Sequence, residues 1–295
     1  MMDMRAALDA HLKSGATTVC RAWAVTRADG VTLGFTDHDC DFLIEGVTYR
    51  AGTGLTARSL MQSTGLSVDN SEALGALSSD AVREADIEAG RYDGAEVTSW
   101  LVNWAKPEQR VLQFRGTLGE IRRAGGAFEA ELRGLTEDLN QPLGRVFQKP
   151  CSAVLGDGTC QFDLSTAGYA TDIACETVTE GQRFTWSALE GFGPDWFTGG
   201  RLLVLTGAAS GLWAPIRSDE DVAGQRRLTL WQPIRAAILP GDLVRLTAGC
   251  DKRMSTCRLK FDNLVNYQGF PDIPGEDWLV AVPKRAGQNT GGSRR

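Results

Sequence analysis

The sequence is poor in histidine, in basic charge and in long apolar runs, and each shortage narrows what the protein can do. His11 and His38 are its two histidines, and the formal net charge is −6. A nucleic-acid-binding surface needs a field of basic charge, which this balance disfavours. No apolar run approaches the roughly 20 residues of a membrane-spanning helix, and the charged N-terminus lacks the apolar core of a secretory signal. We therefore expect a protein made in the cytoplasm, with no membrane span.

The number of cysteines is odd, which disfavours a framework in which every thiol is paired. There are seven, and a cytosolic chain keeps most thiols reduced. Cys20, Cys40 and Cys175 each lie in or beside strand-like sequence with no partner nearby. We expect these three to be buried and inert, because a free cysteine behaves as a small apolar side chain.

The other four cysteines form two pairs and carry the sharpest chemical signal. Cys151 and Cys160 lie in KPCSAVLGDGTCQFD with eight residues between them, and Cys250 and Cys257 lie in LTAGCDKRMSTCRLKFDN with six. Both pairs read as parts of loops. Thiolates are soft ligands suited to zinc or to an iron–sulfur cluster. The two pairs therefore predict a four-thiolate centre that joins two distant segments.

The spacing leaves the kind of centre open. Structural zinc usually takes at least one tight pair with two to four residues between the cysteines, whereas cluster ligation tolerates varied spacing. The wider gaps favour a cluster only weakly, and two disulfides or unrelated thiols remain the alternative. No histidine lies near either pair. A closed four-thiolate site would be structural rather than catalytic and would stabilise the folded state by ligand binding.

Most of the chain has the two-residue period of β-strands. Asp29-Gly30 and Glu45-Gly46 separate alternating apolar runs, a pattern typical of hairpin turns. Further strands are expected over 60–69, within 95–134 around a Gly125-Gly126 turn, and within 169–249. The sequence predicts a mainly β protein of barrel- or sandwich-like domains with few short helices, plus a small cysteine-ligated C-terminal β-rich domain.

Helices are expected in four short places. They are an amphipathic helix over 1–14, a helix from a Ser79 cap to Gly90, a helix-like connector over 134–148, and a helical turn after Cys257. The predicted domains are an N-terminal helix over 1–16, a β-rich domain over 17–150, a second β-rich domain with the cysteine site over 151–283, and a disordered tail over 284–295.

No catalytic constellation stands out. His38 lies between Asp37 and Asp39, but neighbouring residues of a strand point to opposite faces, so both carboxylates cannot flank the ring from one side. We expect a loop in which one of the two aspartates accepts backbone N–H groups. The tryptophans of the second half are expected to anchor the core and interfaces rather than to form a carbohydrate platform; they are Trp186, Trp196, Trp213 and Trp231.

Two segments carry a family resemblance. RADGVTLGFTDHDCDFLIEGVTYRAGTG (Arg27 to Gly54) resembles the N-terminal domain of phage tail-tip and gene-transfer-agent hub proteins. The two cysteine pairs and the segment after them resemble their C-terminal domain. The matching positions of that segment are Cys250, Asp251, Arg253, Thr256, Cys257, Lys260, Phe261, Asn263, Asn266, Tyr267, Gly269, Phe270, Pro271, Pro274, Gly275 and Asp277. Together the resemblance covers most of the chain, although Cys40 stands where the family usually has a basic residue.

The resemblance implies a structural tail hub rather than an enzyme. Such a hub is trimeric and closes the tail tube, joining a distal tail protein on the tube side to a tip or central fibre protein, with DNA only as cargo through a channel. The protein would be made in the bacterial cytoplasm and would end in the tail of a phage or gene transfer agent. The resemblance also implies a 4Fe–4S cluster, with Cys151, Cys160, Cys250 and Cys257 as its ligands.

Five residues are expected to support the cysteine loop. Asp251 and Arg253 would orient it through an ion pair or backbone hydrogen bonds, and Asn263 and Asn266 would satisfy its buried backbone groups. Lys260 belongs to the same supporting set.

Two alternatives stay open. The first is a metalloenzyme at the particle tip, either a redox iron–sulfur protein or a cell-wall hydrolase. It would need a second cofactor motif or a paired acid and base, and His38 is the one credible start. The second alternative is a zinc-stapled adaptor.

Overall fold

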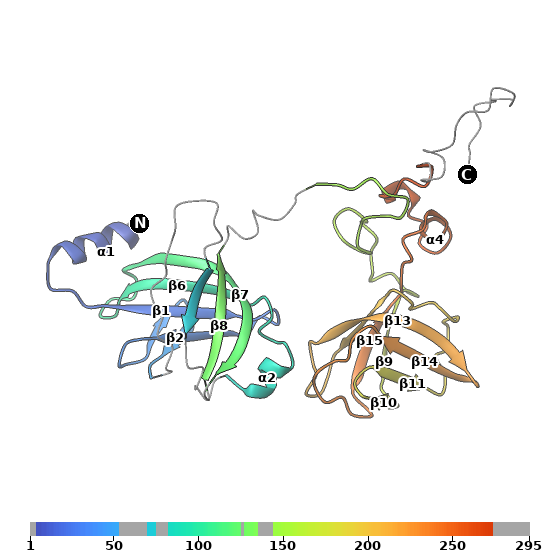
Figure 1. Cartoon of the computed structure of the whole chain (residues 1–295), viewed down its shortest axis with the longest axis horizontal. Coiled ribbons are helices and arrows are strands. Elements are labelled where there is room, and N and C mark those ends of the chain that lie inside the picture. Colours follow the sequence, from blue (N-terminus) through green and yellow to red (C-terminus); the bar gives the residue numbers. More distant parts are fainter. Residues whose placement is uncertain (1–3, 53–69, 75–81, 125–126, 135–143, 274–295) are drawn as a thin grey trace, which may run out of the picture. The chain divides into compact units, whose positions relative to one another are not determined.

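The structure, a computed structural model, describes residues 4–52, 70–74, 82–124, 127–134 and 144–273 (Figure 1). The chain divides into two compact units, Met1–Pro142 and Leu143–Arg295, and each is described by itself. The domain limits predicted at residues 16, 150 and 283 stay predictions. Among the described residues no helix is long and apolar enough to cross a membrane.

The first unit is built on one eight-stranded sheet with the strand order β3-β4-β2-β1-β6-β7-β8-β5. Its neighbouring strands pair antiparallel, except for the parallel pair of β2 and β4. The strands are β1 (Val19–Thr26), β2 (Thr32–Thr36), β3 (Phe42–Ile44), β4 (Val47–Arg50), β5 (Asn70–Leu74), β6 (Glu96–Asn103), β7 (Arg110–Ala124) and β8 (Ala127–Gly134).

Strand β1 is buried on both faces, so the core of this unit lies on two sides of the sheet. Trp23 and Val25 belong to one buried cluster with Phe35. Ala22 and Ala24, which alternate with them, belong to a second cluster. Because successive side chains of a strand point to opposite faces, this burial requires a curled or doubly covered sheet. The predicted barrel- or sandwich-like β architecture is confirmed.

The predicted hairpins of this unit are confirmed. Strands β1 and β2 turn at Asp29-Gly30, where Gly30 takes a φ of 84° that favours glycine. Strands β3 and β4 turn at Glu45-Gly46. Strands β7 and β8 pair from Ala124 and Ala127 onward.

The helices of this unit are short, as predicted. Helix α1 (Met4–Lys13) buries Leu8. Helix α2 (Glu84–Glu88) is shorter than predicted, with Arg83 at its N-cap, and Gly90 has a φ of 74° just beyond its end. The predicted cap Ser79 and the strand predicted over 60–69 lie outside the described residues.

The second unit contains a seven-stranded antiparallel sheet with the order β10-β11-β14-β13-β12-β15-β9. The strands are β9 (Ala170–Ala174), β10 (Thr177–Thr179), β11 (Arg183–Trp186), β12 (Arg201–Val204), β13 (Trp213–Val222), β14 (Gln225–Leu230) and β15 (Leu243–Thr247).

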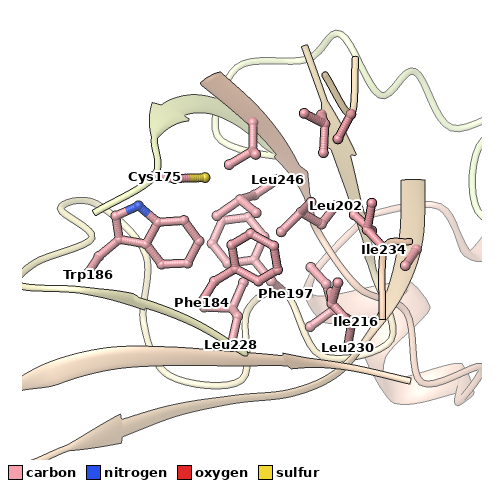
Figure 2. Packing of buried hydrophobic residues seen from close by; sticks show 14 residues of the cluster. Cys175, Phe184, Trp186, Phe197, Leu202, Ile216, Leu228, Leu230, Ile234 and Leu246 are labelled. Carbon is pink, nitrogen blue, oxygen red and sulfur yellow. The ribbon is translucent and has the colours of Figure 1, made fainter. Parts of the chain in front are cut away.

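This second sheet curls so that its two ends approach each other. Strands β9 and β10 stand at opposite ends of the strand order, yet only Cys175 and Glu176 connect them. The Trp186 Nε1–H group of β11 donates a hydrogen bond of 2.8 Å to the main-chain oxygen of Ala174 at the end of β9. The curl encloses a core of buried apolar residues (Figure 2), in which Trp186, Phe184 and Phe197 are fully buried.

The cysteine-bearing segments of this unit lie outside its sheet. They are the segment 144–169 before β9 and the segment 248–273 after β15, which contains helix α4 (Met254–Leu259) and the 3-10 turn η1 (Leu264–Asn266). Figure 1 shows α4 beyond one end of the sheet. Turn η1 confirms the helical turn predicted after Cys257. Residues 144–148 are not helical, so that part of the predicted connector helix is wrong.

Candidate metal centre

The structure brings the four predicted ligands together around one pocket. Cys151, Cys160, Cys250 and Cys257 all line it, although residues 161–249, which include the whole barrel-like sheet, separate the two pairs. The thiols of Cys250 and Cys257 are near enough to the others for their charges to interact. All four cysteines are free.

The second pair enters the pocket from two kinds of structure. Cys250 follows the end of β15, and Lys252 has a left-handed φ of 66° that turns the chain into α4. Cys257 is buried on α4, and its N–H group bonds the carbonyl of Arg253 at 3.0 Å. The prediction that both pairs are borne on loops is therefore wrong for Cys257. The helix arises because residues 254–259 contain no glycine or proline that would interrupt it.

The first pair is shaped by a carboxylate that sequence reasoning missed. Asp157 accepts hydrogen bonds from the backbone N–H groups of Val154 (2.8 Å), Thr159 (2.9 Å) and Cys160 (2.6 Å). Hydrogen bonds to the charged form, the one from Cys160 first, lower the pKa of Asp157 to about 2. The signal was present in the sequence, because Asp-Gly within a loop is a common turn former.

The two predicted asparagines connect the pairs to each other. The Asn263 Nδ2 group donates to the main-chain oxygen of Cys160 at 2.7 Å, and it lies 3.6 Å from the sulfur of that residue. The main-chain oxygen of Asn263 accepts from the thiol of Cys257 at 3.2 Å. Asn266 donates to the Asn263 side chain at 2.7 Å and fixes its orientation. Asn263 thus touches one cysteine of each pair.

Lys260 ties the cysteine segments to the sheet rather than to the pocket. Its ammonium group donates to the main-chain oxygens of Trp196 (2.6 Å) and Gly249 (2.9 Å) and lies 4.3 Å from the centre of the Trp196 ring. Burial lowers its pKa, and the negative charges nearby act against that shift. The carbonyl of Lys260 accepts from the Tyr169 hydroxyl at 2.6 Å. These contacts fix the base of α4 on the sheet end.

Two further residues hold Cys151 and were missed from the sequence. The backbone N–H of Gln268 points at the Cys151 sulfur at 3.4 Å. The Tyr267 hydroxyl donates to the main-chain oxygen of Lys149 at 2.9 Å and lies 3.3 Å from that of Lys252. A backbone donor leaves no mark in the sequence. Tyr267 stood in the recognised motif but carried no predicted role.

The remaining predicted supports are weaker. Arg253 and Asp251 are both exposed and lie 3.7 Å apart at their nearest charged atoms. The Asp251 carboxylate also accepts the Arg253 backbone N–H at 3.0 Å. This local bond caps the turn before α4. An exposed ion pair at that distance contributes little to stability.

The electrostatics of the pocket disfavour thiolates unless a cation is present. Burial raises the pKa of Cys257 to about 11, and the neighbouring thiol sites add to the shift. Burial also raises the pKa of Cys250. A bound metal inverts this balance, because coordination deprotonates a thiol. Among the described residues, no three His, Cys, Asp or Glu side chains stand close enough together to hold one metal ion.

The other three cysteines and His38 are not among the residues that line this pocket. Cys20 and Cys175 are buried as predicted, but Cys40 is exposed, so that prediction is wrong for it. The His38 ring accepts the Cys40 backbone N–H at 2.9 Å and packs on Trp104 with ring centres 4.7 Å apart. Asp37 accepts the backbone N–H of Arg21 at 2.7 Å. The predicted role of an aspartate as backbone acceptor is confirmed.

Comparison with known proteins decides the family. Residues 5–163 match the family described as baseplate hub protein, N-terminal attachment domain. The chain belongs to this baseplate hub family. Residues 195–277 of the hub chain match a second family, described as a phage conserved hypothetical protein. The first match contains Cys151 and Cys160 and the second contains Cys250 and Cys257, so the pocket combines residues of both matched regions.

A solved structure supports the same assignment. The hub chain is similar to a chain in a structure titled "Virion of native gene transfer agent (GTA) particle", at 54% sequence identity and a TM-score of 0.89. The likeness covers 97% of this chain and 98% of that one. A comparison with curated proteins found no match. The predicted resemblance is confirmed, and the hub chain is a structural protein of a phage-type tail baseplate.

Proposed function

We propose that this hub chain joins the end of a tail tube to the tip or fibre protein of a phage-like particle or gene transfer agent, and that a 4Fe–4S cluster held by Cys151, Cys160, Cys250 and Cys257 fastens its second unit. The hub would work as a homotrimer between a distal tail protein and a tip or central fibre protein. DNA would pass through it as cargo. The likeness to a chain of a gene transfer agent virion supports this role.

The observation that carries the cluster proposal is the convergence of four thiols on one pocket. Residues from two segments separated by a whole sheet meet there. The donor set is chemically uniform, since the pocket lining contains four cysteines and no histidine, aspartate or glutamate. Four thiolates are the ligand set of 4Fe–4S clusters and of closed structural zinc sites.

The arrangement favours a cluster over a single zinc ion. Structural zinc usually takes at least one tight pair of cysteines with two to four residues between them, whereas the gaps here are eight and six residues. Donors aimed at two sulfurs, from the Gln268 backbone and the Asn263 amide, are of the kind that tune thiolate-ligated clusters. The zinc-stapled adaptor remains the second candidate for the same pocket.

The structure gives the enzyme alternative little support. His38 packs on Trp104 and bonds the backbone of Cys40, and these contacts account for both its ring face and one ring nitrogen. In this hub the four-thiolate pocket would have a structural role rather than a catalytic one. It fastens the segment that precedes the sheet to the segment that follows it, as a crosslink does.

The metal is tested by anaerobic purification of the wild-type chain and of Cys257→Ser, with a visible spectrum and metal analysis. We expect a broad band near about 400 nm, with iron and sulfide, that disappears in Cys257→Ser. Cys40→Ser is the matched control, because Cys40 lies outside the pocket; it should keep the band. One zinc per chain would move the centre to the second candidate, and metal-free wild-type protein would refute both.

The joining role is tested separately, in cells that produce the particles. Removal of the chain should yield tubes that lack the tip protein, seen by electron microscopy and by quantitative mass spectrometry of purified particles. Particles that carry the tip protein in wild-type amount without the hub chain would refute the joining role, whatever metal the purified chain holds.

A further inference from the structure

The outer face of the barrel-like sheet carries an unusual group of side chains across β12, β13 and the end of β14. Register pairs Arg201 with Pro215 and Leu203 with Trp213, so these four side chains lie on one face. Trp231 adjoins them, because its N–H group bonds the carbonyl of Pro215 at 3.0 Å. The inward residues of the same strands are fully buried, so this face is the outer one.

Both tryptophans are exposed, and each carries a guanidinium over its ring. Trp213 has an exposed fraction of 53% and Trp231 of 64%. Arg201 lies 4.6 Å from the centre of the Trp213 ring, and Arg217 lies 5.5 Å from that of Trp231. We call these four residues the Trp–Arg face. Single exposed apolar side chains are common on protein surfaces, whereas exposed aromatic rings grouped with arginines are typical of interaction surfaces.

Stacking fixes the two guanidinium groups without using their hydrogen bonds. A guanidinium above an aromatic ring interacts through its plane, and its N–H edge stays available for a carboxylate. Neither Arg201 nor Arg217 forms an ion pair within the part of the chain that the structure describes. Both guanidinium groups thus lie over a ring, and no carboxylate of the described residues pairs with either of them.

The neighbouring strand shows what a completed pairing looks like. Arg245 of β15 faces the same side as Leu203, and it holds Asp172 of β9 through two hydrogen bonds of 2.7 Å each. Arg245 is therefore neutralised by Asp172, whereas Arg201 and Arg217 on the same sheet face are not neutralised by any described carboxylate. These two arginines give the Trp–Arg face a local positive charge on a chain whose net charge is −6.

We propose that the Trp–Arg face is a docking surface for a different protein of the tail, one that presents carboxylates beside apolar side chains. Trp and Arg are the residues most enriched at the centres of protein interfaces, and fixed arginines lose little side-chain entropy when a carboxylate arrives. A two-fold contact with a second copy would set arginine against arginine, whereas the head-to-tail contact of a homotrimer would not, and the crosslinking experiment below distinguishes that case. A sugar would need a bare indole face, but each ring already has a guanidinium over one side. This inference stands independently of the thiol pocket.

The first test uses particles made in producing cells from variant hub chains. Arg201→Glu with Arg217→Glu, and Trp213→Ala with Trp231→Ala, should each lower the copies of the hub chain per purified particle by about tenfold or more. Arg183→Glu is the matched control, because Arg183 is an exposed arginine of β11, two strands away from β13; it should incorporate normally. Wild-type incorporation of both double variants would overturn the proposal, and so would normal assembly with loss of attachment to cells, which would point to a polysaccharide instead.

The second test keeps the face intact and therefore does not depend on variant folding. A photo-crosslinking amino acid replaces the exposed Gln232, next to Trp231, and purified particles are irradiated. A crosslink to an acidic peptide of another tail protein supports the proposal. A crosslink to the hub chain itself, or to no protein, refutes it.

Discussion

The side-chain amide of Asn263 lies 2.7 Å from the main-chain oxygen of Cys160, a residue 103 positions earlier in the chain. The backbone of Asn263 also bonds Cys257 in both directions, accepting from its thiol and donating its own N–H to the Cys257 carbonyl at 3.0 Å. One residue thereby sets the separation between the two cysteine pairs. Asn263 therefore contacts both cysteine pairs.

Replacing Asn263 should weaken the centre while leaving all four thiols in place. Loss of a residue that orients metal ligands typically costs about tenfold or more in metal affinity, so Asn263→Ala should lose its metal to a chelator about ten times faster than wild type. Asn266→Ala removes only the bond to the Asn263 side chain and should have a smaller effect. Equal rates of metal loss in Asn263→Ala and wild type would show that the amide is incidental.

The segment before Cys151 should become accessible to protease when the centre is lost. Arg145 donates to the carbonyl of Gln268 at 3.0 Å and lies 5.1 Å from the Phe270 ring centre, on which Phe147 also packs. Gln268 in turn contacts the Cys151 sulfur. Limited trypsin digestion should cut after Arg145 about tenfold faster in Cys257→Ser than in wild type, because local opening governs cleavage.

A second variant separates the protection of the segment before Cys151 from the binding of the metal. Phe270→Ala removes the aromatic contact of Arg145 but touches no cysteine, so it should speed cleavage at Arg145 while the metal content stays near wild type. Cys40→Ser should leave both unchanged. If the segment before Cys151 stays protected from trypsin in Cys257→Ser, its contacts with the protein alone hold it.

The bond between Trp186 and Ala174 should contribute measurably to the stability of the second unit. Trp186→Phe keeps an aromatic ring in the core but removes the Nε1–H donor, so the carbonyl of Ala174, an exposed residue, loses this hydrogen bond. We expect a loss of about 0.5–1.5 kcal/mol in the free energy of unfolding, against about 3–5 kcal/mol for Trp186→Ala. Trp213→Phe, at an exposed position, should change it by less than about 0.5 kcal/mol. Chemical denaturation followed by circular dichroism measures all three.

The ion pair of Asp172 and Arg245 should make stability depend on acid pH. Hydrogen bonding by Arg245 holds the pKa of Asp172 below its ordinary value. Because the folded-state pKa is the lower one, the pair contributes its full stability above about pH 5 and loses it as the pH falls through the folded-state pKa. The stability of wild type should therefore fall more steeply with acid than that of Asp172→Asn. Parallel curves for the two proteins would show that water screens the pair completely.

The sequence by itself determined the β architecture. It also predicted that four particular cysteines meet, and it identified two of the residues that support them. Strand periodicity and Asp29-Gly30 predicted the first hairpin correctly, because alternation and turn chemistry are local properties. The cysteine motif also pointed to Asn263 and Asn266, whose side chains bridge the loop. The predicted loop character failed at Cys257, which lies on the short helix α4.

Only the tertiary structure decided which residues of the same type are buried and which are exposed. Trp186 and Trp231 lie in similar sequence, but the curl of the sheet buries the first and exposes the second. Cys20 and Cys40 both adjoin strands, and only the first faces a core. The Tyr267 hydroxyl bonds the main-chain oxygen of Lys149, and the Gln268 N–H group points at the Cys151 sulfur. Each contact joins residues more than 100 positions apart. No local pattern encodes such distances. The antiparallel pairing of β9 with β15 sets Ala170 opposite Thr247 and so brings the two cysteine segments to the same end of the sheet.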